Sequence, residues 1–466
     1  MTFVRNRALG IAAAALGALL MSLAVAGTSD AAPRVVTLNG FKAPGTPAQY
    51  NKVKVVKQGS PQGKKILVLV PGTSAGATNF GPLASALVKQ LKGWQVWSIE
   101  RRENLLEDHT ALQKYLKGTA TGQELYDYYL GSIINPAINP KFTPKTDEET
   151  SFAKDWGMNV AVNDVRKVVN LANRGGREVV LGGHSLGGSI TTAYATWDFN
   201  GKAGAKSLDG LVFIDGAGAS GASRPLPTAA QAQENLDSLN DPGESPFLTL
   251  VPPFPWAAGV FNAIGSTLAL KEPNAPATLG ASPIIPSYLK PPVPATNAGS
   301  YGYAVDNDTG PESLVLVQSH IGQLAAAGDP RGWQNGELGT VSRAASVFSE
   351  HVGSMDGTSW YHPTRLSIDA GAINNGINNP AQAVYGDKAT KGKSVKLPMY
   401  SFDTVLGGGR VADATRALAR QSKVPYKWIR TVKRVGTYSH IDPLSASPAK
   451  NDFIKTLVPF LKTRVK

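Results

Sequence analysis

Two serines of this chain lie in Gly-x-Ser-x-Gly sequences, a pattern that can carry a reactive hydroxyl. Ser185 lies in Gly-His-Ser-Leu-Gly at 183–187, and Ser74 lies in Gly-Thr-Ser-Ala-Gly at 72–76. Both follow an apolar run, and a segment with helical character comes directly after Ser185. A strand, a sharp turn and a helix in this order lift a serine hydroxyl above a parallel sheet. The hydroxyl becomes a good nucleophile only when a general base takes its proton.

Chain order favours Ser185 as the nucleophile and His440 as its base. In a site built on such a turn, the serine comes first, the acid second and the histidine last. Of the six histidines, His440 alone follows the last predicted strand and precedes a terminal helix. Ser74 follows an early strand and has little chain before it. We therefore expect Ser74 to belong to a loop that serves Ser185.

The acid that would orient His440 has two main candidates. Asp403 ends the predicted strand after a long inserted segment, and Asp215 ends the strand before that segment. On chain order we predict Asp403, with Asp215 as the alternative and Asp413 third. An aspartate at a strand end can also belong to a plain turn.

Hydrolysis of an acyl group also needs two backbone N–H donors for the negative oxygen that forms. One donor follows the nucleophile, and the other comes from an earlier strand-to-helix loop. We expect the N–H groups of Leu186 and Thr73 in these roles. The alternative is that the Gly72 loop is a simple tight turn and that Ser185 only begins a glycine-rich, phosphate-binding helix.

The elements that must position these residues alternate between strand and helix. Apolar runs predict strands, and apolar residues at helical spacing predict helices. Alternation of this kind predicts an α/β fold with a mostly parallel sheet and helices on both faces. From 217 to 394 the alternation stops, and a segment of that length is too long for a loop, so we predict a large cap inserted between the sixth and seventh core strands. The predicted strands are short strands within 35–59 and the segments 64–70, 94–99, 178–183, 211–214, 397–402 and 426–435, and the predicted helices are 80–91, 156–172, 186–197, 411–419 and 453–461.

The N-terminus predicts a signal peptide that ends at Ala31. Arg5 and Arg7 precede an uncharged run over 8–27, and small residues follow it. The alternative is a retained membrane anchor, because about 20 apolar residues can span a bilayer. The predicted organisation is therefore a signal peptide at 1–31, a first core part at 32–216, the cap at 217–394 and a second core part at 395–466.

Composition excludes several kinds of site. The 466 residues include no cysteine, which excludes disulfides, a cysteine nucleophile and thiolate metal sites. The formal net charge of +13 is spread along the chain, and no nucleic-acid motif accompanies it. We expect no cofactor, no metal, no nucleic acid partner and a monomeric state, with membrane contact only if the N-terminal segment is retained.

The chain resembles the α/β-hydrolase superfamily, and in particular its secreted bacterial esterases and lipases. The resemblance rests on 183–188 (GHSLGG), 69–73 (LVPGT) and 438–443 (YSHIDP), and many relatives have His-Gly where this chain has Pro71-Gly72. It implies a secreted or cell-envelope enzyme that cleaves a small-molecule or lipid ester through an acyl-enzyme on Ser185. The alternatives are a non-catalytic secreted binding protein on the same fold, or an enzyme that acts on thioesters or amides or transfers acyl groups.

The predicted cap contains a cluster of aromatic residues. These side chains either line a pocket for an acyl chain or form the core of the cap itself, and we favour the core. The residues are Phe247, Phe254, Trp256 and Phe261.

Overall fold

The computed structural model describes residues 32–218 and 225–465. The predicted signal peptide at 1–31 lies outside the described residues. Within the described ranges, no helix combines the length and the apolar character needed to cross a membrane.

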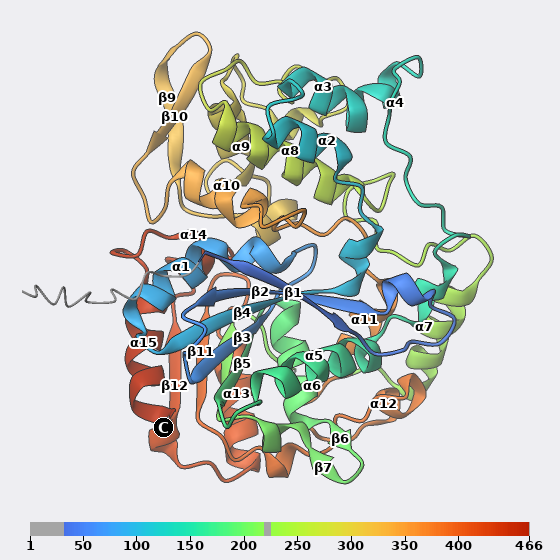
Figure 1. Ribbon diagram of the computed structural model, residues 1–466, viewed down its shortest axis with the longest axis vertical. Coiled ribbons are helices and arrows are strands. Elements are labelled where there is room, and N and C mark those ends of the chain that lie inside the picture. The colour runs from blue at the N-terminus through green and yellow to red at the C-terminus, as the bar shows by residue number, and fades with distance from the viewer. Residues whose placement is uncertain (1–31, 219–224, 466) are drawn as a thin grey trace, which may run out of the picture.

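An eight-stranded sheet forms the centre of the molecule (Figure 1). Its strand order is β1-β2-β4-β3-β5-β8-β11-β12. β2 runs antiparallel to both of its neighbours, and all the other strand pairs are parallel. The predicted α/β fold with a mostly parallel sheet is confirmed. The strands are β1 (Arg34–Asn39), β2 (Lys52–Gly59), β3 (Lys65–Val70), β4 (Trp94–Glu100), β5 (Glu178–His184), β8 (Gly210–Ile214), β11 (Met399–Asp403) and β12 (Ile429–Lys433).

Helices cover both faces of the sheet, as the sequence of β3 requires. Its side chains are all apolar after Lys65, and successive residues of a strand point to opposite faces. Ile66 and Val68 therefore pack in one buried cluster with α5 and α6, whereas Leu67 and Leu69 pack in another with α1 and α15. The helices that flank the sheet are α1 (Gly81–Gln90), α5 (Met158–Ala172), α6 (Leu186–Thr196), α13 (Arg410–Gln421) and α15 (Asp452–Arg464).

The cap lies above one end of the sheet and is built from two separate segments of the chain (Figure 1). The first segment leaves the sheet after β4, and the second leaves it after β8. Apolar residues of both segments, such as Leu112, Leu130 and Val260, share one buried cluster. The cap elements are α2 (Thr110–Leu116), α3 (Gly122–Tyr126), α4 (Ser132–Ile134), α8 (Ala257–Lys271), α9 (Asn297–Val305), β9 (Gly322–Gly328), β10 (Arg331–Asn335) and α10 (Val341–Ser349).

The segment 217–394 is consequently not one structural unit, which corrects the predicted boundaries. Leu366 and Ala370 of α11 (Thr364–Ala370) pack in the core cluster that contains α5 and α6. α7 (Ala229–Asn240) and α12 (Pro380–Tyr385) pack against each other beside the core rather than in the cap. The sequence did not reveal this division because all parts of the segment share a similar Pro- and Gly-rich composition.

The aromatic cluster of the cap is mainly core. Phe247 and Trp256 are 3% and 5% exposed and belong to the buried cap cluster. Phe254 is 38% exposed and stacks on Trp256. Phe261 lines an apolar cavity.

Candidate active site

Ser185 lies in a sharp turn between β5 and α6, as predicted. Its φ is +55° and its ψ is −126°, a conformation that is strained for a residue with a side chain. A Cβ on Gly183 would lie 2.0 Å from Gly187 O, and a Cβ on Gly187 would lie 2.0 Å from Val70 O. The two motif glycines are therefore required by close backbone contacts around the serine.

The carboxylate that contacts His440 belongs to Asp215. His440 Nδ1 lies 2.6 Å from Asp215 Oδ2, and both side chains are buried. Thr404 donates to Asp215 through its N–H and its hydroxyl, and Gly407 N–H donates a third hydrogen bond. Burial alone would raise the pKa of Asp215, but His440 and the Thr404 donors hold it below its usual value, so the carboxylate stays ionised.

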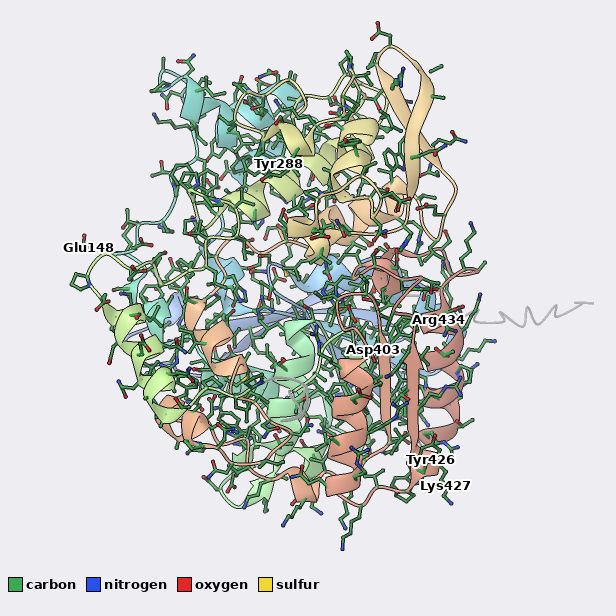
Figure 2. The ribbon with its side chains drawn as sticks, turned by 180° about the vertical axis from the view of Figure 1, so that it is seen from behind. Glu148, Tyr288, Asp403, Tyr426, Lys427 and Arg434 are labelled. Atoms are coloured by element: carbon green, nitrogen blue, oxygen red, sulfur yellow. The ribbon has the colours of Figure 1, made fainter. Side chains whose placement is uncertain are left out.

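Asp403 has a different role, which corrects our preference for it as the acid. Its two carboxylate oxygens accept hydrogen bonds from the N–H groups of Val411 and Ala412 at 3.0 and 2.8 Å. These groups lie in the first turn of α13, where free backbone donors favour a carboxylate. Figure 2 shows Asp403 near the cap-facing end of the sheet, with Tyr426 and Lys427 at the opposite end. Asp413, the third candidate, is exposed and pairs with Arg416 and Lys433.

The Gly72 loop lies against Ser185. A Cβ on Gly72 would lie 2.7 Å from Ser185 Cβ. In the described part of the chain, neither Thr73 N–H nor Leu186 N–H has a hydrogen-bond acceptor. Two unpaired backbone donors beside a serine hydroxyl are what an oxyanion site requires.

Arg101 fixes the orientation of this loop, and sequence reasoning missed it. Its Nη1 donates to Pro71 O at 2.7 Å and to Gly72 O at 2.8 Å, and the side chain is buried. In a trans peptide, the carbonyl of Gly72 and the N–H of Thr73 point in opposite directions. By holding the carbonyl on its own side, Arg101 turns the Thr73 N–H away from itself. No motif in the sequence marks an arginine at a strand end for this task.

His184 supports the main chain at His440. Its Nε2 lies 3.0 Å from His440 O, and the two rings are 4.2 Å apart. Burial, and then the neighbouring His440, lower the pKa of His184 to about 3, so the imidazole is neutral. A neutral ring that donates from Nε2 to a carbonyl fits this geometry. The sequence indicated only that His184 lies within the turn.

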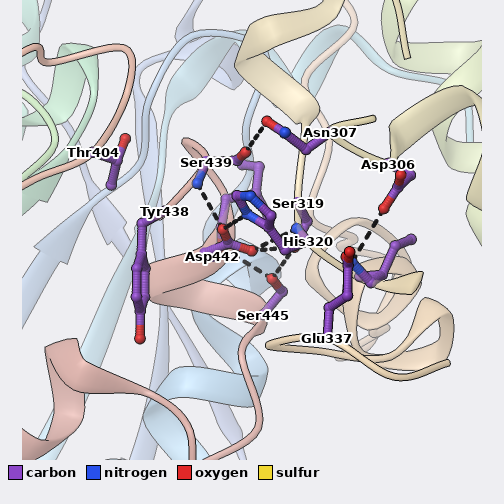
Figure 3. Close-up of polar contacts among 12 residues, drawn as sticks. Asp306, Asn307, Ser319, His320, Glu337, Thr404, Tyr438, Ser439, Asp442 and Ser445 are labelled. Atoms are coloured by element: carbon purple, nitrogen blue, oxygen red, sulfur yellow. Dashed lines mark hydrogen bonds and ion pairs between the residues drawn. The ribbon is translucent and has the colours of Figure 1, made fainter. Parts of the chain in front are cut away.

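The loop that carries His440 is held by a second polar network (Figure 3). Asp442 is buried and accepts hydrogen bonds from Ser439 N–H, from the Ser319 hydroxyl, and from the N–H and Nδ1 of His320. Ser319 and His320 belong to the cap segment, so the network ties the cap to the histidine loop. Ser439 also donates to Asn307.

Ser185 and His440 line the same cavity of about 110 Å³ beneath the cap. In the described part of the chain, no hydrogen bond joins Ser185 Oγ to His440 Nε2. Such bonds are often absent before substrate binds. The cap side of the cavity is mostly apolar, with Asn262 and Ser313 as its polar members. Its large apolar residues are Leu250, Val251, Leu314, Leu316 and Val317.

A second cavity of about 140 Å³ lies between α8 and α9 in the cap. Its lining is mostly apolar and includes Phe261, Leu268 and Ile285. The two cavities share wall residues, so the second cavity directly adjoins the first. The shared residues are Val251, Ala258, Asn262, Leu314 and Val317.

No protein-family model and no curated protein matches this chain. Among solved structures, the chain is similar to a lipase candidate from Sulfolobus solfataricus, with 13% identity, a TM-score of 0.49 and coverage of 92% of this chain and 93% of that chain. It is also similar to a soluble variant of monoglyceride lipase from Saccharomyces cerevisiae (11% identity, TM-score 0.41, coverage 94% and 97%). A third similar structure is epoxide hydrolase A from Mycobacterium thermoresistibile (12% identity, TM-score 0.43, coverage 92% and 98%).

Proposed function

We propose that this chain, whose strand order and serine turn are those of the α/β-hydrolase fold, is a serine hydrolase that cleaves carboxylic esters. The observation that carries the proposal is that His440, which lines the same cavity as Ser185, is hydrogen-bonded through Nδ1 to the buried Asp215. A buried aspartate that orients a histidine beside a serine is the arrangement that activates a hydroxyl for acyl transfer.

In the proposed reaction, Ser185 Oγ attacks the ester carbonyl while His440 Nε2 takes its proton. The ionised Asp215 stabilises the imidazolium that forms. The negative oxygen of the tetrahedral intermediate accepts hydrogen bonds from the Thr73 and Leu186 amides. His440 then protonates the departing alcohol and leaves an acyl-Ser185 ester. A water molecule that gives its proton to His440 attacks this ester. His440 then returns the proton to Ser185 Oγ as the bond to the acyl carbon breaks and the acid is released.

The lining of the site supports an apolar substrate group. Leu314 and Val317 face both the Ser185 cavity and the adjoining cap cavity. An apolar acyl chain that moves from water into these cavities would gain about 0.8 kcal/mol of binding free energy for each buried CH₂. We therefore propose esters of apolar acids as the substrate class.

The proposal is tested with Ser185→Ala and short p-nitrophenyl esters. Turnover should fall by a factor of at least about 10³, because the nucleophile is gone while the oxyanion donors remain. Ser342→Ala, on the exposed start of α10, is the matched control and should keep full activity. A fluorophosphonate reagent should label the wild type and not Ser185→Ala. A folded wild type that neither reacts with the reagent nor turns over any ester would support the non-catalytic binding protein instead.

We also propose that the protein is exported, because Arg5 and Arg7 precede an uncharged run at 8–27 that is followed by small residues. N-terminal sequencing of protein recovered from the culture medium should find a chain that begins at Ala32. A chain that keeps residues 8–27 and sediments with membranes would favour the anchored form.

A further inference from the structure

A second cluster of ionisable groups lies outside the proposed catalytic residues. Glu107 and His109 follow β4 at the start of the first cap segment, and Asp356 lies far along the chain, after α10. The segment after Asp356 pairs with the Gly72 loop through the isolated antiparallel bridge between Ala75 and Thr358. The cluster therefore joins two distant parts of the chain, and the second of these pairs with the proposed oxyanion loop.

Each of the two carboxylates uses only one of its oxygens for hydrogen bonds. Glu107 Oε1 accepts from Trp360 N–H at 2.8 Å, and Asp356 Oδ1 accepts from the N–H and the hydroxyl of Thr358, each at 2.8 Å. The other oxygens, Glu107 Oε2 and Asp356 Oδ2, lie 3.1 and 3.5 Å from His109 Nε2.

Glu107 Oε2, Asp356 Oδ2 and His109 Nε2 point toward one another. They all lie within 4.8 Å of one another. In the described part of the chain, each is buried and none meets hydrogen-bond geometry with any partner. The side chains of Glu107 and Asp356 are each only 1% exposed. Buried polar atoms without partners are costly, so such a group calls for an explanation.

The local charge also favours a cation. Burial, and then the charge of Glu107, raise the pKa of the nearby Glu100 to about 8, so that this group is neutral at pH 7 and Glu107 and Asp356 are the acids that face His109. A protonated His109 supplies at most one positive charge against these acids. His351 is the other imidazole that faces Asp356, and neither of its ring nitrogens has a hydrogen-bond partner in the described ranges.

We propose that Glu107, His109 and Asp356 bind a divalent cation of the zinc type. Zinc takes imidazole nitrogen and carboxylate oxygen at about 2.0–2.2 Å, so tetrahedral ligands lie roughly 3.3 Å apart, close to the separations seen here. Calcium and magnesium prefer oxygen-only sites. The ion links the first cap segment to the segment that pairs with the Gly72 loop, and water completes its coordination. Its role is structural, and it takes no part in the acyl chemistry.

The test uses the full chain, treated with EDTA, freed of the chelator and then titrated with ZnCl₂. We expect one zinc ion per chain by elemental analysis after gel filtration, and a rise in Tm of several degrees. CoCl₂ should give the visible absorption of a low-symmetry four-coordinate site. MgCl₂ and CaCl₂ at the same concentration should leave Tm unchanged.

The variants Glu107→Gln and Asp356→Asn should lose the zinc stoichiometry and the Tm response. Asp306→Asn, at another buried aspartate of the second cap segment, is the control and should keep both. Wild-type protein that retains no zinc and shows no Tm response would mean that the cluster is only an ion triad around protonated His109. Equal zinc binding by the wild type and both variants would equally overturn the site. If the variants do not fold, the wild-type stoichiometry and cobalt spectrum decide alone. None of these readouts depends on hydrolase activity.

Discussion

Gly72 lies so close to Ser185 that a Cβ on Gly72 would lie 2.7 Å from Ser185 Cβ and 3.4 Å from its Oγ. The loop and the serine turn therefore pack against each other directly. Because the Thr73 N–H follows Gly72 in the chain, this contact also sets the distance between the serine and one of the proposed oxyanion donors.

Gly72→Ala should reduce activity more than stability. The added methyl must push the loop or Ser185 away, and a displacement of about 1 Å can cost roughly 10²-fold in rate. We expect kcat for a p-nitrophenyl ester to fall by at least about 10-fold. Gly332→Ala, at a glycine with open space around it, should change neither kcat nor Tm. An unchanged kcat in Gly72→Ala would contradict the packed arrangement of loop and serine.

Asp215→Asn and Asp403→Asn separate the two candidate acids. Replacing Asp215 removes the carboxylate that contacts His440 Nδ1, so kcat should fall by about 10³- to 10⁴-fold. Replacing Asp403 weakens the carboxylate contact with the first turn of α13, which should lower Tm and leave most of kcat. Steady-state kinetics and thermal unfolding of both variants test this. A larger loss of kcat in Asp403→Asn would restore Asp403 as the acid.

Arg101→Met should lower kcat with little change in KM. Without the two hydrogen bonds to Pro71 O and Gly72 O, the Thr73 N–H is no longer held in one direction. Loss of a complete oxyanion donor costs about 10²- to 10³-fold in kcat, so a misdirected donor should cost up to that factor. Arg101→Lys keeps the charge and should recover only part of the activity, since one ammonium cannot reproduce the planar fork. Equal activity of wild type and Arg101→Met would exclude this positioning role.

Ala258→Phe tests whether an acyl chain enters the second cavity. Ala258 lines both cavities, so a larger side chain there should close the passage between them. In this variant, kcat/KM for p-nitrophenyl octanoate should fall at least about 10-fold more than kcat/KM for p-nitrophenyl acetate. The acetate has no distant CH₂ groups, so it gains no binding free energy in the second cavity. Ala327→Phe, on the exposed hairpin of the cap, is the control. A parallel loss for both esters would place the acyl chain elsewhere.

Sequence reasoning worked best where a local pattern decides the structure. The apolar strand, the glycines at 183 and 187 and the following helix are enough to predict the Ser185 turn, because all of these signals lie in one short stretch of the sequence. The contact of Gly183 lies within the motif, whereas the contact of Gly187 with Val70 O involves a distant strand. The continuous apolar run at 66–70 predicts a strand buried on both faces for the same reason.

The sequence could not predict contacts between distant segments. Asp215 and Asp403 end neighbouring parallel strands, and only the register of those strands and the turn after each decide which carboxylate meets His440. The division of 217–394 between cap and core depends likewise on where each helix packs. Arg101 and the Glu107–His109–Asp356 cluster depend on partners that lie elsewhere in the chain.

Burial of His362 should make stability depend on pH. The side chain is buried, and its Nε2 lies 3.0 Å from Ser367 Oγ. Burial, and then the charge of Arg101, lower the pKa of His362 from 6.5 to about 3 in the folded protein. The unfolded chain therefore binds a proton below pH 6.5 that the folded protein excludes until about pH 3. Consequently, the contribution of a neutral His362 is complete above pH 6.5 and is lost as the pH falls from 6.5 towards 3.

His362→Gln removes this titration and keeps a polar side chain. Urea unfolding of the wild type and of His362→Gln should be compared at pH 7.5 and pH 4.5. From pH 7.5 to pH 4.5, the free energy of unfolding should fall by about 3 kcal/mol more for the wild type than for the variant. The difference arises over the roughly two pH units below 6.5, at about 1.4 kcal/mol for each unit. His184 and the buried carboxylates are common to both proteins, so their contributions cancel in the comparison. An identical pH dependence in the two proteins would show that His362 titrates in the fold as it does in water.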